Sequence, residues 1–281
     1  MSQLTSAPAP STAPTFSDEP AAVEGRFIWY ELMTPDQDAA ARFYGEVVGW
    51  TAADQPTPDA NGQRYLVLSA GDRGVGGILR LSQEMRDGGA RPGWIGYVNV
   101  PDTDEAARRI KEAGGAIHMA PQDIPGIGRF AMVADPGGAP FYVMTPLPRD
   151  DVPPPAAPMT PGHVSWHELY AGNGEEAAFA FYAGQFGWET MTEMDMGAMG
   201  KYRIFGAEGV QMGGMMDKPK DMPAPSWTFY VNVDGIDAAI GRIEANGGKV
   251  AMGPHQVPGG SWIVQAFDPQ GASFALLSER R

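Results

Sequence analysis

The strongest constraint on the fold is that the sequence contains the same series of short motifs twice. Each copy has a Phe-Tyr pair, a Gly-Trp pair, a Gly-Gly pair, a Val-Asn-Val triplet and an Asp-Pro-x-Gly turn, in that order. The first copy carries them at residues 43–44, 49–50, 76–77, 98–100 and 135–138, and the second at 181–182, 187–188, 213–214, 231–233 and 268–271. An ordered repeat of this length indicates duplication. We therefore expect two similar domains, residues 25–146 and 163–281.

Two segments outside the repeats contain little that could form a core. Residues 1–24 are dominated by Ala, Pro, Ser and Thr and lack a basic start followed by an apolar run. We therefore predict a disordered tail that is not a secretory signal. Residues 147–162 are rich in proline, which favours an extended linker between the domains.

The hydrophobic pattern within each repeat switches between the periods of a strand and of a helix. Residues 27–34 read as a strand, and the apolar residues that follow form a helical stripe ending at Gly49. After three more strands the same order restarts, which predicts an α+β fold with two βαβββ units in each domain. The strands of the first domain are expected at 27–34, 50–53, 63–69, 76–81, 94–100, 116–119, 127–134 and 139–145, and its second helix at 103–113. The residues expected to cap the four helices are Thr34, Asp102, Asn173 and Asp234.

Composition argues against several classes of function. The 281 residues carry a formal net charge of −14 and the pI is about 4.6, so the surface should repel nucleic acid and anionic lipid. No apolar run reaches the roughly 18 residues that a membrane span needs. The chain has no cysteine, which removes disulfides and thiolate chemistry and suits a cytoplasmic location.

The order of these motifs resembles the vicinal-oxygen-chelate superfamily, which contains glyoxalase I, bleomycin-resistance proteins and extradiol dioxygenases. More narrowly, the Trp-x-Glu-Leu opening strands and the tandem layout are similar to two-domain glyoxalase-like proteins. The resemblance covers residues 26–146 and 163–279. It implies that the two units of each domain curl a mixed sheet around a cleft, in which inward side chains of metal-using members hold a divalent cation.

The residues at the implied metal positions are poor ligands. Three of the four positions in each domain align, and the fourth falls near Arg80 and Asp217. The aligned residues are Trp29, Ile95 and Tyr142 in the first domain and Trp166, Thr228 and Ala275 in the second. A divalent cation needs several oxygen or nitrogen ligands that converge. We therefore predict no metal site and no cofactor, with a divalent metal as the alternative.

The four histidines do not supply another metal site. His163 and His167 are four residues apart, but on a strand this spacing separates them by roughly 13 Å. We expect His167 to face the helices as a hydrogen-bonded packing residue. His118 and His255 are expected at the surface or the cleft rim.

Alternation along the strands predicts which side chains face the cleft. Each domain then presents a Trp, a Glu, a Tyr and an Asn, which is typical of an apolar small-molecule pocket with a few polar groups. The expected ligand contacts are Trp29, Tyr97, Asn99, Tyr142, Trp166, Thr228, Tyr230 and Asn232. Burial of Glu31 and Glu168 would raise their pKa and could make either a catalytic acid or base. The alternative is that both are core residues without a chemical role.

The sequence leaves three functions open. The first is a metal-free protein that binds a small apolar or aromatic molecule in its clefts. The second is an enzyme of the glyoxalase, isomerase or dioxygenase type that uses Glu31 or Glu168 as acid, base or ligand. The third is a protein that acts through its surface. Partners other than a small molecule are not predicted, and the chain is expected to be a monomer or a homodimer.

Overall fold

The structure is a computed structural model that describes residues 24–55, 63–148 and 156–281. Almost all of the predicted tail and about half of the predicted linker lie outside these residues. Within the described part of the chain, no helix has the length and apolar character needed to cross a membrane.

The first half of the chain forms one eight-stranded mixed sheet with the order β2-β3-β4-β1-β5-β8-β7-β6. The opening strands of its two units, β1 and β5, pair antiparallel at the centre of the sheet. The strands are β1 (Phe27–Thr34), β2 (Thr51–Asp54), β3 (Tyr65–Ala70), β4 (Arg73–Arg80), β5 (Gly93–Asn99), β6 (Ala116–Ile124), β7 (Gly128–Ala134) and β8 (Pro140–Pro146). The helices are α1 (Gln37–Val48), α2 (Gln83–Asp87) and α3 (Thr103–Glu112).

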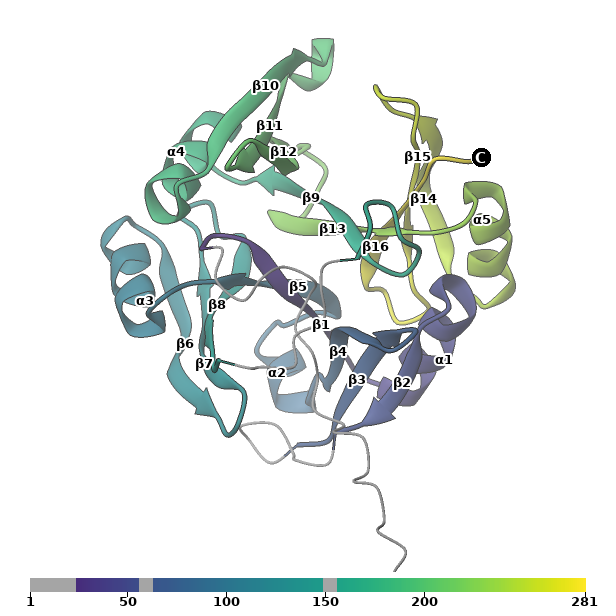
Figure 1. The fold of residues 1–281 in the computed structure, drawn as a ribbon, viewed down its shortest axis with the longest axis horizontal. Helices are drawn as coiled ribbons and strands as arrows, with labels where there is room; N and C mark the ends of the chain where they lie inside the picture. Colours follow the sequence, from purple (N-terminus) through teal and green to yellow (C-terminus); the bar gives the residue numbers. More distant parts are fainter. Residues whose placement is uncertain (1–23, 56–62, 149–155) are drawn as a thin grey trace, which may run out of the picture.

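The second half repeats this sheet strand for strand, in the order β10-β11-β12-β9-β13-β16-β15-β14. Its strands are β9 (Val164–Ala171), β10 (Glu189–Asp195), β11 (Lys201–Ala207), β12 (Val210–Asp217), β13 (Ser226–Asn232), β14 (Lys249–Gln256), β15 (Trp262–Phe267) and β16 (Ser273–Ser278). Its helices are α4 (Glu175–Phe186), the 3₁₀ turn η1 (Gly197–Met199) and α5 (Ile236–Ala245). The predicted α+β fold with tandem duplicated domains is confirmed, and each sheet curls without closing into a barrel (Figure 1).

Three of the four predicted helix caps are wrong. Asp102 does cap α3, because its Oδ1 accepts a hydrogen bond from the Glu105 amide at 2.9 Å. Thr34 is the last residue of β1, and Asp36 caps α1 instead by accepting from Ala39. The error has a simple cause, since two polar residues flank Pro35 and the helix starts after the second one.

In the second half, the N-cap residues of α4 and α5 are glycines, so they have no side chain that could accept a capping hydrogen bond. The N-cap positions are Gly174 and Gly235, not Asn173 and Asp234. The start of α4 is stabilised from outside the helix, because Asp217 Oδ1 at the end of β12 accepts from the Glu175 amide at 2.7 Å. A contact this distant in sequence leaves no local signal.

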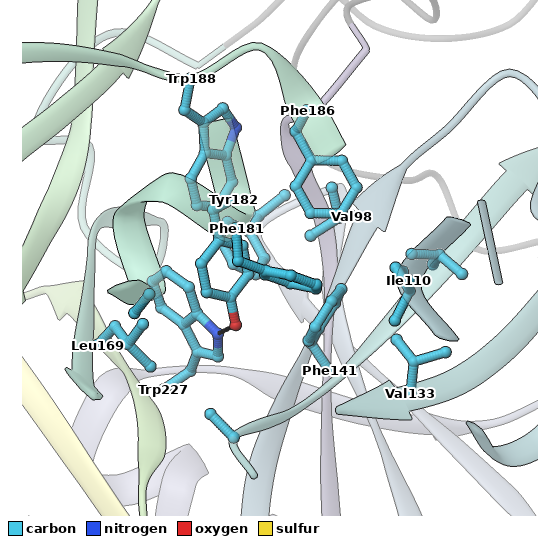
Figure 2. Close-up of a cluster of buried hydrophobic side chains, with 14 of the residues drawn as sticks. Val98, Ile110, Val133, Phe141, Leu169, Phe181, Tyr182, Phe186, Trp188 and Trp227 are labelled. Atoms are coloured by element: carbon cyan, nitrogen blue, oxygen red, sulfur yellow. Dashed lines mark hydrogen bonds between the residues drawn. The ribbon is translucent and has the colours of Figure 1, made fainter. Parts of the chain in front are cut away.

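The helices α1, α3, α4 and α5 pack where the two halves meet and contribute to cores that both halves share. In Figure 1, α3 and α4 lie next to each other, as do α1 and α5. Figure 2 shows one shared core, in which Phe141 of β8 packs beside Tyr182 and Phe186 of α4. The centroids of the Phe141 and Tyr182 rings are 5.6 Å apart. The second shared core joins residues of α1 and β4 to residues of α5 and β16.

The repeated motifs make reciprocal hydrogen bonds between the halves. The Phe-Tyr tyrosines Tyr44 and Tyr182 donate to the Asp-Pro-x-Gly aspartates Asp268 and Asp135 of the opposite half, at 3.3 and 3.1 Å. The Gly-Trp indoles do the same with the glycines that precede the opening strands. Trp50 donates to the carbonyl of Gly162 at 2.7 Å, and Trp188 to that of Gly25 at 2.8 Å. The motifs therefore recur because each half needs them to dock on the other.

Candidate functional site

The candidate sites are two clusters of side chains around the glutamates of the Trp-x-Glu strands, on the sheet faces where the resemblance implies ligand clefts, and we call them cleft 1 and cleft 2. Cleft 1 consists of the buried Ile28, Trp29, Met33, Leu81, Ile95, Tyr97, Phe130, Tyr142 and Met144, together with Glu31. Cleft 2 consists of Trp166, Tyr230, Ile263, Ala275 and Leu277, with Met159 packed against them, together with Glu168.

A row of aromatic side chains crosses the floor of cleft 1. Trp29 lies opposite Tyr97 in the antiparallel β1–β5 pair, and Tyr97 lies beside Tyr142 in the parallel β5–β8 pair. The rings of Tyr97 and Tyr142 stack with their centroids 4.2 Å apart and an interplanar angle of 16°. A β-bulge between Phe27 and Trp29 turns the Trp29 indole to this face. The predicted aromatic residues are therefore brought together.

Glu31 is buried beside this row and is held by phenol hydroxyls. It is 4% exposed, and the Tyr97 hydroxyl donates to its Oε2 at 3.1 Å. Tyr65 of β3 is a second phenol partner, and its oxygen accepts a hydrogen bond from the Trp29 indole at 2.8 Å. Burial raises the pKa of Tyr65 and of Tyr97, and the charge of Glu31 adds to the rise.

Tyr65 was missed at the sequence level, although a signal for it exists. It recurs as Tyr202, and each tyrosine lies over a glycine of the Gly-Gly pair. A Cβ at Gly77 would stand 1.9 Å from the Tyr65 hydroxyl, and a Cβ at Gly214 would stand 2.2 Å from the Tyr202 ring. Gly77 and Gly214 are therefore required because any larger residue would collide with the phenol ring of Tyr65 or Tyr202.

Cleft 2 has the same glutamate and a different set of partners. Glu168 is 7% exposed and accepts hydrogen bonds from the hydroxyls of Tyr230 and Tyr170. The Gln265 amide donates to both of these phenol oxygens, at 2.7 Å and 2.9 Å respectively. Trp166 donates to the Tyr202 hydroxyl at 2.9 Å, as Trp29 does to Tyr65. Tyr170 and Gln265 replace Met33 and Met132 of cleft 1, so cleft 2 is more polar.

The pKa of Glu168 is raised to about 7, mainly because burial disfavours the carboxylate. The hydrogen bonds from Tyr230 and Tyr170 act in the opposite direction and stabilise the charged form. A carboxyl group in this state exchanges its proton near neutral pH. This property is what an acid–base role or a pH-dependent ligand contact requires.

The remaining predicted residues lie at the edges of this arrangement. Thr228 is buried opposite Glu168 in the β9–β13 register. Asn232 accepts from Ser165 Oγ at 2.5 Å and donates to the Thr160 carbonyl at 3.2 Å, so its amide holds the segment before β9. Asn99 is 8% exposed at the end of β5. The glutamate networks and the asparagines are thus separate features of the clefts.

The histidines are not part of either glutamate network. His167 points away from Glu168 toward β1 of the first half and not toward a helix: its Nε2 lies 2.7 Å from the Tyr30 hydroxyl and its Nδ1 lies 2.7 Å from the Met212 carbonyl oxygen. Burial lowers its pKa to about 4. The expected packing role of His167 agrees with these contacts. His118 and His255 are exposed on β6 and β14.

The donor groups in each cleft can be compared with the needs of a metal ion. Within the described residues, no group of three or more His, Asp, Glu or Cys side chains converges as an ion site. Asp217 is engaged at the start of α4, and Arg80 is exposed at the end of β4. Each cleft offers one carboxylate, surrounded by phenol, indole and aliphatic groups.

Comparison with known proteins places this fold in a family. The profile of the glyoxalase/bleomycin resistance protein/dioxygenase superfamily matches residues 26–143 and 162–276. The chain belongs to this superfamily. It is 30% identical over 256 residues to a putative glyoxylase, CFP32, of Mycobacterium tuberculosis, covering 89% of this chain and 93% of that protein. It is also 30% identical over 273 residues to the anthracycline biosynthesis protein DnrV of Streptomyces peucetius, covering 90% of this chain and 92% of that protein.

Solved structures of the superfamily share the fold at low sequence identity. A Mn(II)-bound glyoxalase from Novosphingobium aromaticivorans superposes with a TM-score of 0.61 at 16% identity, covering 92% of this chain and 83% of that one. The 2,3-dioxygenase LapB from Pseudomonas sp. KL28 superposes with a TM-score of 0.60 at 13% identity, covering 92% of this chain and 93% of that one. At this identity the likeness concerns the fold alone.

Proposed function

We propose that this chain binds a small apolar or aromatic organic molecule in its clefts, without the divalent metal that other members of the superfamily hold. The observation that carries the proposal is the composition of the cleft floors, where indole and phenol rings surround a single buried glutamate. Aromatic and aliphatic side chains around a few fixed polar groups are the composition that small-molecule pockets usually have. The proposed ligand contacts are Trp29, Tyr97, Asn99 and Tyr142 in cleft 1 and Trp166, Thr228, Tyr230 and Asn232 in cleft 2.

The donor set of each cleft does not fit a divalent cation. Such an ion needs several converging oxygen or nitrogen ligands at about 2.0–2.6 Å. Glu31 and Glu168 are instead committed to tyrosine hydroxyls, and indole and aliphatic groups surround them. The Mn(II) of the Novosphingobium glyoxalase is therefore not carried over to this chain. That two relatives are anthracycline biosynthesis proteins supports an organic ligand.

The experiment that tests this proposal measures metal and organic content together. The full chain is purified from cells supplied separately with Mg, Mn, Fe, Ni or Zn, and the metal content is measured by elemental analysis. We expect less than about a tenth of an equivalent of any metal, and an organic molecule in native mass spectra. One equivalent of metal that is lost in Glu31→Gln or Glu168→Gln, and retained in the surface control Asp195→Asn, would refute the proposal.

A second candidate function is acid–base catalysis, and the pKa of Glu168 favours it. A carboxyl group with a pKa of about 7 can both accept and return a proton near neutral pH. Glu31 holds the equivalent position in cleft 1. In an assay with a substrate that turns over, Glu168→Gln or Glu31→Gln should abolish turnover, whereas Tyr142→Phe should retain it. Full activity in both glutamine variants would rule out this role.

A further inference from the structure

The two clefts differ at the position that decides whether a ring stands beside the central tyrosine. In cleft 1, Tyr142 stacks on Tyr97. The same parallel register in cleft 2 pairs Tyr230 with Ala275. Trp166 lies opposite Tyr230 and packs against the same cluster, but the position that the Tyr142 ring holds in cleft 1 is occupied by the Ala275 methyl group. Tyr230 in cleft 2 therefore lacks the stacked tyrosine ring that Tyr97 has in cleft 1.

Two neighbouring positions also differ between the clefts. Phe130, whose ring centroid lies 5.8 Å from that of Tyr142, is replaced by Ile263. Met144 is replaced by Leu277, which is 9% exposed, whereas Met144 is fully buried. Two smaller side chains, Ala275 and Ile263, thus stand where cleft 1 has the rings of Tyr142 and Phe130.

Met159 covers this part of cleft 2. It lies in the segment before β9, is half-buried and packs against the cluster of Tyr230, Ala275 and Leu277. Its φ of 63° is in the left-handed region, which a residue other than glycine rarely adopts. Methionine is flexible and fills irregular space. The Met159 contact with a hydrogen-bond donor is a long one, from Ser165 Oγ to its sulfur at 3.9 Å, so a better-fitting group can displace this side chain at low cost.

We propose that cleft 2 binds a phenol-sized aromatic ring, which displaces Met159 and stacks on Tyr230 in the position that the Tyr142 ring occupies in cleft 1. In cleft 1 this particular ring position is already filled by Tyr142. This inference rests on the proposed function and assigns the ring position beside the central tyrosine to cleft 2.

The polar edge of this position sets the ligand class further. Gln265 lies directly opposite Ala275 in the β15–β16 register, and its amide links the Tyr170 and Tyr230 hydroxyls. In cleft 1 the residue opposite Tyr142 is Met132, which offers no such group. A ring that enters beside Ala275 meets the amide and the two phenol oxygens. The ligand is therefore an aromatic ring that carries a hydroxyl group, not a plain hydrocarbon.

The test uses p-cresol, which is the tyrosine side chain with a hydrogen atom in place of the bond to Cα. Calorimetric titration of the full chain should give one equivalent bound. Ala275→Tyr restores the cleft 1 arrangement and should weaken binding at least tenfold, whereas the control Ala275→Ser should bind within threefold of the parent chain. Met159→Ala removes the cover and should tighten binding by threefold or more.

Two further measurements separate position from chemistry. Toluene lacks the hydroxyl and should bind at least fivefold more weakly than p-cresol, and Gln265→Met should remove this difference. Tyr142→Ala should raise the stoichiometry from one to two by opening cleft 1. If this variant does not fold, the affinities of Ala275→Tyr and Ala275→Ser for p-cresol still test the inference.

Binding of p-cresol to Ala275→Tyr with unchanged affinity would overturn the inference, and so would its failure to bind the parent chain. Neither result affects the proposed function, which is tested by metal content and by the organic molecule that copurifies. Conversely, a stoichiometric metal in cleft 1 would refute the proposed function there and leave the ring position beside Tyr230 to be decided by the titration.

Discussion

Cleft 1 and cleft 2 are built on equivalent strands but are filled in different ways. In cleft 1 nine hydrophobic side chains are buried together around Glu31, and Tyr142 stacks on Tyr97. In cleft 2 only Tyr230, Ala275 and Leu277 form the buried cluster, and Gln265 and Tyr170 add polar groups near Glu168. The Trp-x-Glu strand and the tyrosine over the Gly-Gly pair are the same in both.

This difference separates two parts of the repeat. The helix-side residues are constrained by contacts between the halves, and the cleft-side residues can change in one half alone. On the helix side, Tyr44 and Tyr182 make matching bonds to aspartates of the opposite half. A change there would break a contact on which both halves depend. A change on the cleft side affects one half alone. Identity on the helix side and divergence in the clefts is what this arrangement predicts.

The largest difference in stability between matched variants of the two clefts is expected for position 142. Tyr142→Ala removes a ring that is 2% exposed and stacked in a close-packed cluster, so it should lower the free energy of unfolding by about 3–5 kcal/mol. The matched change Ala275→Gly should cost about 1 kcal/mol, since it removes one methyl group and loosens a strand. Urea unfolding of both variants measures the difference. Equal costs would show that the two clefts are packed alike.

The next effect concerns the protonation of Glu168. Its pKa of about 7 in the folded chain lies above the ordinary value of 4.5, so the native state binds more protons than the unfolded state between these pH values. The contribution of Glu168 to stability should therefore be greatest below pH 4.5 and should be lost, by about 3 kcal/mol, as pH rises through 7.

Glu168→Gln removes this contribution, and the measured quantity is the stability of the parent chain minus that of the variant at each pH. The subtraction is needed because His167, with its pKa lowered to about 4, has the opposite effect: it costs stability as pH falls below its ordinary value of 6.5. A difference that does not change between pH 4.5 and 7 would contradict the assigned environment of Glu168.

A smaller and equal effect is expected on the helix side of the two halves. Tyr44→Phe and Tyr182→Phe each remove a hydrogen bond to a buried aspartate and an acceptor for a tryptophan indole. Each should cost about 1–2 kcal/mol. Denaturant midpoints for the two variants should agree closely. A strong difference between them would show that the reciprocal contacts are not equivalent.

The smallest effect is expected for Gln265→Met, which gives cleft 2 the residue that cleft 1 has at this position. The amide donates to Tyr170 and Tyr230 but is half-buried, so water can replace part of what is lost. The cost should be about 0.5–1 kcal/mol, measured by thermal unfolding. A loss of more than about 2 kcal/mol would mean that the polar network, and not the apolar floor, holds cleft 2 together.

Much of the fold could be predicted from sequence because the repeat and the strand period are local. The helix stop at Gly49 and the cap at Asp102 follow from the residues themselves. The start of α4 does not, because its partner Asp217 lies on β12. The short helix α2, with five residues between two strands, has no apolar stripe from which it could be predicted.

The candidate site shows the same division. Alternation correctly groups Trp29, Tyr97 and Tyr142, since all three lie on strands with a fixed period. The pairing of the strands was less accessible: Trp29 lies opposite Tyr97 and Glu31 opposite Ile95, with a β-bulge between Phe27 and Trp29 that no local sequence signal indicates. The role of Gln265 depends on two phenols from other strands, so no single segment of the sequence contains it.

The shared cores have a consequence for how the chain is made. On the ribosome the first half emerges before the second, yet Phe43 and Tyr44 of α1 pack on Phe274 of β16, the last strand of the second half. Until the second half has been synthesised, the first half exposes an apolar face that favours aggregation or chaperone binding. Ribosome-stalled chains ending before residue 260 should accordingly be sensitive to protease and bind chaperones, and release of the full chain should abolish both.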